Sequence, residues 1–112
     1  MVSIDIERRI IVDKFEMIVV IANAGFSGEV MDAARSIGAM GGTVMHARGT
    51  GRKEAEETFK ITINPEKDLI IIAVNEKIKD DVMKAIYDRA GLNTNANAVA
   101  FSLPISSSVG IK

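Results

Sequence analysis

The chain of 112 residues contains no cysteine and a single histidine, His46. The absence of cysteine excludes disulfide bonds, thiolate nucleophiles and cysteine-based zinc sites. One histidine also excludes a metal site built from several histidines of the same chain. The longest apolar stretches, 17–22 and 69–74, are far shorter than the roughly 20 residues that span a bilayer. We therefore expect no membrane insertion. A cytoplasmic location is also expected, since the first residues lack the apolar core of a signal peptide.

An excess of charge of either sign is also missing. Fourteen basic and fifteen acidic residues give a formal net charge of −1. Proteins that bind nucleic acid usually gather a basic excess on one face, so we expect no nucleic-acid partner. Hydrophobic residues make up 47% of the chain and charged residues 26%, which is typical of an ordinary globular domain.

The first half of the chain has the pattern of a strand, a helix and a second strand. Residues 17–22 form a continuous apolar run rich in β-branched side chains, which indicates a strand covered on both faces. Ser27 is a predicted helix N-cap. Glu29 lies in the first turn, where its negative charge interacts favourably with the positive N-terminal end of the helix dipole. Three glycines between residues 38 and 42 end this helix, and Thr43–Arg48 is predicted as the second strand. The helix has an apolar stripe at 3.6-residue spacing that comprises Val30, Ala33, Ala34 and Ile37.

The second half repeats this order. Residues 58–63 alternate as a strand with one covered face should, and 64–68 are predicted as a turn containing Pro65. The apolar run 69–74 is a second buried strand, followed by a helix that Asn75 caps and that ends before Gly91 as a C′ residue. The apolar stripe of this helix comprises Ile78, Val82, Ala85 and Ile86. The final strand is expected over 98–103.

The order of these elements predicts an α+β, ferredoxin-like split β-α-β sandwich (βαββαβ), an antiparallel sheet with two helices on one face. The other sheet face is then bare, and large exposed apolar patches are rare on monomers. We therefore expect a homo-oligomer. The domain is predicted to span 16–112, preceded by an N-terminal extension, 1–15. The sequence leaves open whether this extension adds an edge strand, wraps a neighbour or is only partly ordered.

Residues 48–57 form the most distinctive stretch of the sequence, Arg-Gly-Thr-Gly-Arg-Lys-Glu-Ala-Glu-Glu. It lies between two predicted strands, where a tight hairpin would need only about two to five residues. Its glycines, at 49 and 51, allow close approach of a ligand to the backbone. Its basic side chains, which can pair with phosphate or carboxylate oxygens, are Arg48, Arg52 and Lys53. Two interpretations remain open here: an anion-binding or partner-docking loop, or an ordinary solvated connector.

The stretch from Gly42 to Arg52, with Thr-Val, four residues and then Gly-x-Gly-Arg, resembles PII signal-transduction proteins, the nitrogen regulatory proteins. The resemblance extends over the order of elements from about Glu16 to Ile105. It includes the Pro-Glu-Lys stretch at 65–67 and Phe-Ser-Leu-Pro at 101–104. Only the 43–52 motif within it is specific.

This resemblance implies a non-enzymatic homotrimer that regulates nitrogen metabolism. It implies adenine nucleotide (ATP, ADP or AMP) in clefts between subunits, and a T-loop, here 48–57, that docks on a partner enzyme or transporter. By this resemblance Thr43 lies near the adenine, Gly49 and Gly51 bring backbone close to the nucleotide, and Arg52 reaches its phosphates. The predicted binding residues are therefore Thr43, Gly49, Gly51 and Arg52 from this resemblance, together with Lys53 for its charge and Asn97 for its hydrogen-bonding side chain. No catalytic residue and no metal ligand is predicted.

The sequence also departs from the family pattern. Lys53 stands where the family has a glutamine, and the only tyrosine, Tyr87, lies outside the loop. Gly91–Asn97 replaces the lysine-containing loop that grips phosphates, and the C-terminal arginines of the family are absent. A mono- or dinucleotide, another small anion or no nucleotide therefore remain alternatives.

Three further groups have simpler interpretations. The polar residues of 93–97 could hydrogen-bond a ligand, but asparagines are commonest in turns for backbone reasons, and a turn is favoured. His46 could bind a metal across a trimer axis, but a strand histidine with satisfied hydrogen bonds is favoured. The acidic residues of 54–57 are expected to keep the loop solvated or to meet a basic partner surface rather than to form a catalytic pair.

Two other functions compete with regulation. One is a structural or metal-tolerance trimer of the same fold, in which 48–57 is only a connector. The other is a ferredoxin-like enzyme such as an acyl-phosphate hydrolase, which would need an arginine and an asparagine at a phosphate-binding loop. The sequence does not contain such a site in assembled form.

Overall fold

The computed structural model describes residues 2–5, 10–50 and 65–111, with side chains from residue 14 onward in these ranges. The strand predicted over 58–63 lies outside the described residues. The elements are β1 (Val2–Asp5), β2 (Ile10–Asp13), β3 (Phe15–Asn23), α1 (Ser27–Ile37), β4 (Thr43–Arg48), β5 (Glu66–Asn75), α3 (Glu76–Ala90) and β6 (Val99–Pro104).

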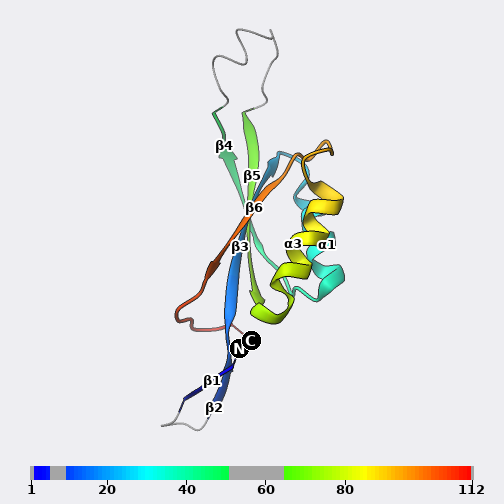
Figure 1. Ribbon diagram of the computed structural model, residues 1–112. Helices are drawn as coiled ribbons and strands as arrows, with labels where there is room; N and C mark the ends of the chain where they lie inside the picture. Colours follow the sequence, from blue (N-terminus) through cyan, green and yellow to red (C-terminus); the bar gives the residue numbers. More distant parts are fainter. Residues whose placement is uncertain (1, 6–9, 51–64, 112) are drawn as a thin grey trace.

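Four of these strands form one antiparallel sheet in the order β4-β5-β3-β6. The two helices, α1 and α3, lie together on one face of the sheet (Figure 1). This arrangement confirms the predicted ferredoxin-like fold. The strands β1 and β2 pair only with each other among the described strands, as a separate antiparallel hairpin. None of the described helices is long and apolar enough to cross a membrane.

The core lies between the sheet and the helices. Alternate residues of β3 and β5 face the helices, and the register sets Ile18 beside Ile72 and Val20 beside Ile70. All four are fully buried, together with Val30 of α1 and with Val82 and Ile86 of α3. Burial of this size is the main stabilising term of the fold. Within one chain the helix face of β3 and β5 is buried, whereas on the other face Val19 is buried and its neighbours are only half-buried, so the expectation of two covered faces is met only in part.

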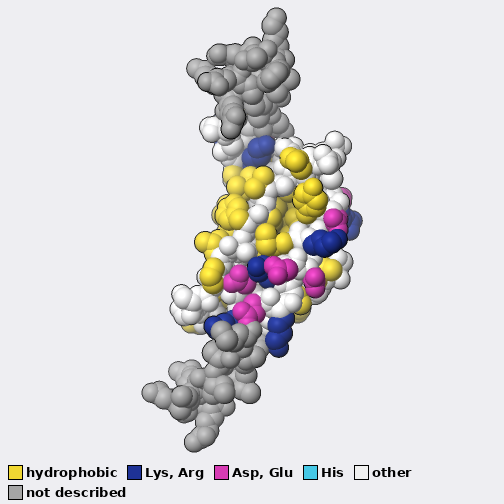
Figure 2. All heavy atoms as spheres, in the orientation of Figure 1, with side chains coloured by type: hydrophobic (Ala, Val, Ile, Leu, Met, Phe, Trp, Pro, Cys, Tyr) yellow, Lys and Arg dark blue, Asp and Glu magenta, His cyan; other side chains and the backbone are white. Residues whose placement is uncertain are grey.

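The opposite face of the sheet is apolar and open. Cross-strand pairing places Phe101 beside Val19 and Met45 beside Leu69 on this face, because directly opposite residues point to the same side. Phe101 is 45% exposed and Met45 42% exposed. Figure 2 shows hydrophobic side chains gathered over the middle of the molecule, where Figure 1 places the strands. We call this surface the open sheet face: Met17, Val19, Ile21, Met45, Leu69, Ile71, Val99, Phe101 and Leu103.

The helix ends agree with the sequence in part. Asn75 caps α3, since its Oδ1 accepts the backbone N–H of Lys77 at 2.9 Å. Gly38 ends α1 with φ 117°, a conformation that glycine tolerates best. The prediction for Ser27 was wrong, because Ser27 is the first helical residue and Phe26 occupies the cap without a side-chain bond. Gly91 follows α3 as expected, in an extended rather than left-handed conformation, φ −78°.

The predicted turn over 64–68 was wrong for its last three residues. They belong to β5, where Glu66, Lys67 and Asp68 lie opposite Arg48, Ala47 and His46 of β4. The two strands therefore continue side by side toward segment 49–65. Glu66 is exposed and Lys67 half-buried in this part of β5, whereas Asp68 is buried.

Candidate functional site

The root of the predicted loop is fixed by backbone pairing. Gly49 donates its N–H to the carbonyl oxygen of Pro65 at 2.7 Å, one step beyond the Arg48–Glu66 pair. The side chains of this pair lie 3.9 Å apart and are mostly exposed, so their attraction adds little stability. The root is therefore held by the strand ladder, and Gly49 marks the point where the chain leaves it.

A chain of polar contacts runs from this root across the sheet. A Cβ atom at Gly49 would lie 3.2 Å from Cε of Lys67, so the lysine stem packs against the glycine. The Lys67 Nζ donates to Asn23 Oδ1 at 2.6 Å, and Asn23 Nδ2 donates to the carbonyl oxygen of Asn95 at 2.9 Å. The backbone N–H of Asn23 also donates to the carbonyl oxygen of Ala96 at 2.9 Å. These contacts connect Gly49 with segment 91–98.

Segment 91–98 consists of turns, as its asparagine content favoured. Thr94 donates both its N–H and its hydroxyl to the carbonyl oxygen of Gly91, at 3.1 and 2.8 Å. Asn97 donates its N–H to the carbonyl oxygen of Thr94 at 3.1 Å and has φ 45°. Asparagine is one of the few residues other than glycine that adopts this conformation readily. The Asn97 side chain is exposed at the same end of the sheet as Gly49.

Thr43 lies elsewhere. It is the first residue of β4 and pairs with Ile71, whereas Gly49 follows the last residue of this strand. A rise of roughly 3.3 Å per residue puts Thr43 about 16 Å from Arg48. The structure thus brings Gly49 and Asn97 to one end of the sheet and leaves Thr43 at the other end of the edge strand. Gly51, Arg52 and Lys53 lie outside the described residues.

A second polar cluster lies at the loop root, on the helix side of β4. His46 Nδ1 is 2.9 Å from Asp68 Oδ1, and Asp68 Oδ2 accepts the backbone N–H of Gly25 at 3.0 Å. Asp68 is 2% exposed, whereas the His46 side chain is 90% exposed. A buried carboxylate needs such partners. His46 is therefore a strand histidine with a satisfied ring nitrogen, as favoured. In the described part of the chain no three His, Cys, Asp or Glu residues gather as a metal site would need.

Comparison with known proteins places the chain in a family. Residues 15–112 match the family model described as nitrogen regulatory protein P-II. The chain belongs to the P-II family. Comparison with curated proteins found no match.

Two solved structures support the fold of this P-II family member. A PII-like signalling protein from Thermus thermophilus matches with a TM-score of 0.63 at 13% identity, over 83% of this chain and 87% of that one. Arabidopsis thaliana PII bound to citrate matches with a TM-score of 0.62 at 23% identity, over 85% of this chain and 80% of that one.

The sequence did not reveal every polar residue at the site of this P-II chain. Lys67 and Asp68 were assigned to a turn, and Asn23 lay outside every predicted element. A usable signal was the opposite charge of Arg48 and Glu66, which favours a continued strand pair. The partners of Lys67 and Asp68 follow only from the register of three strands, which a single sequence does not specify.

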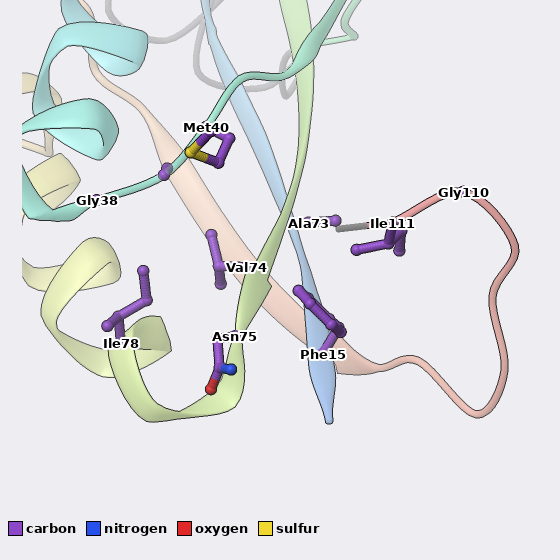
Figure 3. Close-up of a pocket in the computed structure, with 10 residues that line it drawn as sticks. Phe15, Gly38, Met40, Ala73, Val74, Asn75, Ile78, Gly110 and Ile111 are labelled. Atoms are coloured by element: carbon purple, nitrogen blue, oxygen red, sulfur yellow. The ribbon is translucent and has the colours of Figure 1, made fainter. Parts of the chain in front are cut away.

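This P-II chain also contains an apolar hollow at the end of the sheet opposite loop 48–57, where β3 begins and β5 ends. Its volume is about 430 Å³, and Phe15, Met40, Ala73, Ile78 and Ile111 are among the residues that line it (Figure 3). In Figure 3, Met40 of the α1–β4 connection and Ile78 of α3 lie on one side of the β5 ribbon, and Phe15, Ala73 and Ile111 lie on the other. None of Thr43, Gly49 and Asn97 lines the hollow, so it is distinct from the predicted binding residues.

Proposed function

We propose that this chain is a non-enzymatic regulatory subunit that binds a small anionic effector, such as ATP, ADP or AMP, beside loop 48–57. The loop then reports the bound state to a partner enzyme or transporter. Family membership supports regulation of nitrogen metabolism as the setting and the cytoplasm as the location.

The observation that carries this proposal is the contact chain from Gly49 through Lys67 and Asn23 to Asn95. It connects the root of loop 48–57 with the turns of segment 91–98. An effector that touches either segment therefore acts on a segment that contacts the other through Lys67 and Asn23. Such a ligand shifts the loop between conformations in proportion to its different affinity for them.

In this proposal the effector contacts Thr43, Gly49, Gly51, Arg52, Lys53 and Asn97. Thr43 and Gly49 stand at opposite ends of β4, so a ligand that reaches both must extend along that strand. Among the described strands β4 is an edge strand, and this position makes its outer side available to such a ligand and to a neighbouring subunit. This supports a site at a subunit boundary, with Arg52 and Lys53 pairing with the anionic part of the effector.

Self-association into a homotrimer is part of the same proposal. The open sheet face exposes Val99 at 60% and Phe101 at 45% in the single chain. Contiguous apolar surfaces of this kind usually mark protein interfaces. A structural or metal-tolerance trimer would use the same face but would show no response to effectors.

A thermal-shift screen tests the proposal. Adenine nucleotides, 2-oxoglutarate, citrate and bicarbonate are added separately to the purified chain, and its melting temperature is measured. We expect at least one of them to raise the melting temperature, because a ligand that binds only the folded state stabilises it. Arg52→Ala should abolish this shift, and the exposed-helix variant Lys84→Ala should retain it. If no compound shifts the wild type, or if Arg52→Ala shifts equally, the effector role of the loop is wrong.

A further inference from the structure

The family match begins at residue 15, so the hairpin of β1 and β2 is an addition before the P-II fold. Its register is antiparallel, with Ser3 opposite Val12 and Ile4 opposite Ile11. Each strand has only four residues, and in the part of the chain that the structure describes neither pairs with the main sheet. A two-stranded hairpin of this kind is marginal in water by itself and needs a further surface to cover it.

The composition of this hairpin favours an apolar surface. Valine and isoleucine occupy six of the twelve positions 2–13: Val2, Ile4, Ile6, Ile10, Ile11 and Val12. β-branched residues suit a strand that is packed on something. The hairpin is too small to bury so many of them against itself.

The direction of the hairpin is set where it joins the sheet. Lys14 alone separates β2 from β3, and its carbonyl oxygen accepts the N–H of Glu76 at 3.0 Å. The carbonyl oxygen of Phe15 accepts the N–H of Ile105 at 3.0 Å. Both bonds hold the chain in line with β3, and Figure 1 shows β1 and β2 beyond the end of this strand, apart from the helices. The hairpin therefore points away from the body of its own chain.

The apolar hollow lies at this same end. Phe15, from which the hairpin departs, lines the hollow together with Met40, Ala73 and Ile78. Met40 is 89% exposed there. A volume of about 430 Å³ is within the range of sites that take a small ligand or a few side chains. Because the hairpin of the same chain is directed outward, this geometry favours a second molecule as the source of a hairpin that fills the hollow.

We propose that the β1–β2 hairpin is an exchange arm that packs into the apolar hollow of a neighbouring copy of this chain. Each copy then offers one arm and one hollow. Such head-to-tail contacts between unlike surfaces close into a ring when the rotation between neighbours allows it. The inference rests on the proposed self-association and adds to it a contact outside the open sheet face.

Single-cysteine variants test this contact directly, because the natural chain has no cysteine. Ser3→Cys in β1 is co-expressed under one tag with Met40→Cys under another, and the complex is mildly oxidised. We expect a disulfide-linked pair that carries both tags. The control replaces Met40→Cys with Lys84→Cys, a position on α3 with a side chain 76% exposed, and should give little of this product. Equal yields from both pairs would overturn the proposal.

The double variant Ser3→Cys/Met40→Cys separates exchange from folding back. A bond between two chains supports exchange, whereas a bond within one chain means that the arm covers its own hollow and refutes it. Deletion of 2–13 keeps all residues that match the family. It should raise the concentration at which the assembly half-dissociates by about tenfold or more, and an unchanged value would count against the arm.

Failure of the exchange-arm proposal can be distinguished from failure of the proposed function. If the wild type is a trimer that responds to effectors but forms no 3–40 link, only the arm is wrong. If the disulfide between positions 3 and 40 forms while no effector shifts the melting temperature, the exchange arm is supported and the effector role is wrong.

Discussion

Asp68 and His46 form a pair in which the acid is buried and the base is not. Their side-chain atoms Oδ1 and Nδ1 lie 2.9 Å apart across β5 and β4, while Oδ2 of the same carboxylate accepts the N–H of Gly25. One carboxylate thus joins the edge strand that leads to loop 48–57 with the turn before α1. Because no other charged residue among those described is as deeply buried, this contact is the main polar anchor of the loop root.

Asp68→Ala is expected to destabilise the protein by about 1–3 kcal/mol, because it removes a buried carboxylate that accepts the Gly25 N–H and contacts the His46 ring. Urea unfolding followed by circular dichroism measures the change. Arg48→Ala is the matched control two residues from His46, since its ion pair with Glu66 is exposed, and should change stability by less than about 0.5 kcal/mol. Equal midpoints for the two variants would contradict an anchoring role for Asp68.

The helices and strands could be predicted because their apolar residues recur at different spacings along the sequence. The continuous apolar runs gave β3 and β5, and the 3.6-residue stripes gave α1 and α3. The start of β5 could not be predicted, because Glu66, Lys67 and Asp68 resemble a turn until their β4 partners are known. Local composition favours a turn there, whereas cross-strand contacts with Arg48 and His46 make it a strand.

The candidate site shows the same limit. Gly49 was singled out from a motif and a family resemblance and Asn97 from its polar side chain, and the structure places both at one end of the sheet. The residues that connect them, Lys67 and Asn23, carry no motif. They meet only because the register sets them opposite each other on neighbouring strands. The register between two strands depends on the three-dimensional fold, so the contact between Lys67 and Asn23 could not be predicted from the sequence.

Gly42 gives a sharp packing prediction. A Cβ atom there would lie 2.9 Å from the carbonyl oxygen of Ile71 and 3.0 Å from Sδ of Met31. We expect Gly42→Ala to cost about 1–3 kcal/mol, because the backbone of β5 cannot withdraw without moving the sheet. The neighbouring Gly41→Ala meets nothing within 4 Å and should be neutral or slightly stabilising. Thermal unfolding of both variants checks this, and a similar loss in each would mean that the approach of β4 to β5 is less tight.

The open sheet face gives a prediction about assembly. Phe101→Glu places a charge in the middle of this face and should convert a trimer into a monomer, since an unpaired charge is costly to bury. Size-exclusion chromatography with light scattering measures the mass. Tyr87→Glu is the control, because Tyr87 is 60% exposed on α3, outside the face. A wild-type monomer, or a Phe101→Glu variant of unchanged mass, would show that the face is not the interface.

The contact between Lys67 and Asn23 can be isolated by a double-mutant cycle. Its 2.6 Å hydrogen bond links the strand beside Gly49 to the strand that holds segment 91–98. Lys67→Ala and Asn23→Ala should each destabilise the chain, and the double variant should lose less than the sum, by about 0.5–1.5 kcal/mol.

Hydrogen exchange adds a second readout: Lys67→Ala should speed exchange of the Ala96–Ala98 amides, although it removes no contact to them directly. The exposed pair Lys84→Ala and Asp88→Ala, whose side chains are 2.8 Å apart within α3, serves as the control cycle and should leave these amides unchanged. If the Lys67 variant also leaves them unchanged, the loop root and segment 91–98 are independent, and an effector bound at one would have no path of contacts to the other.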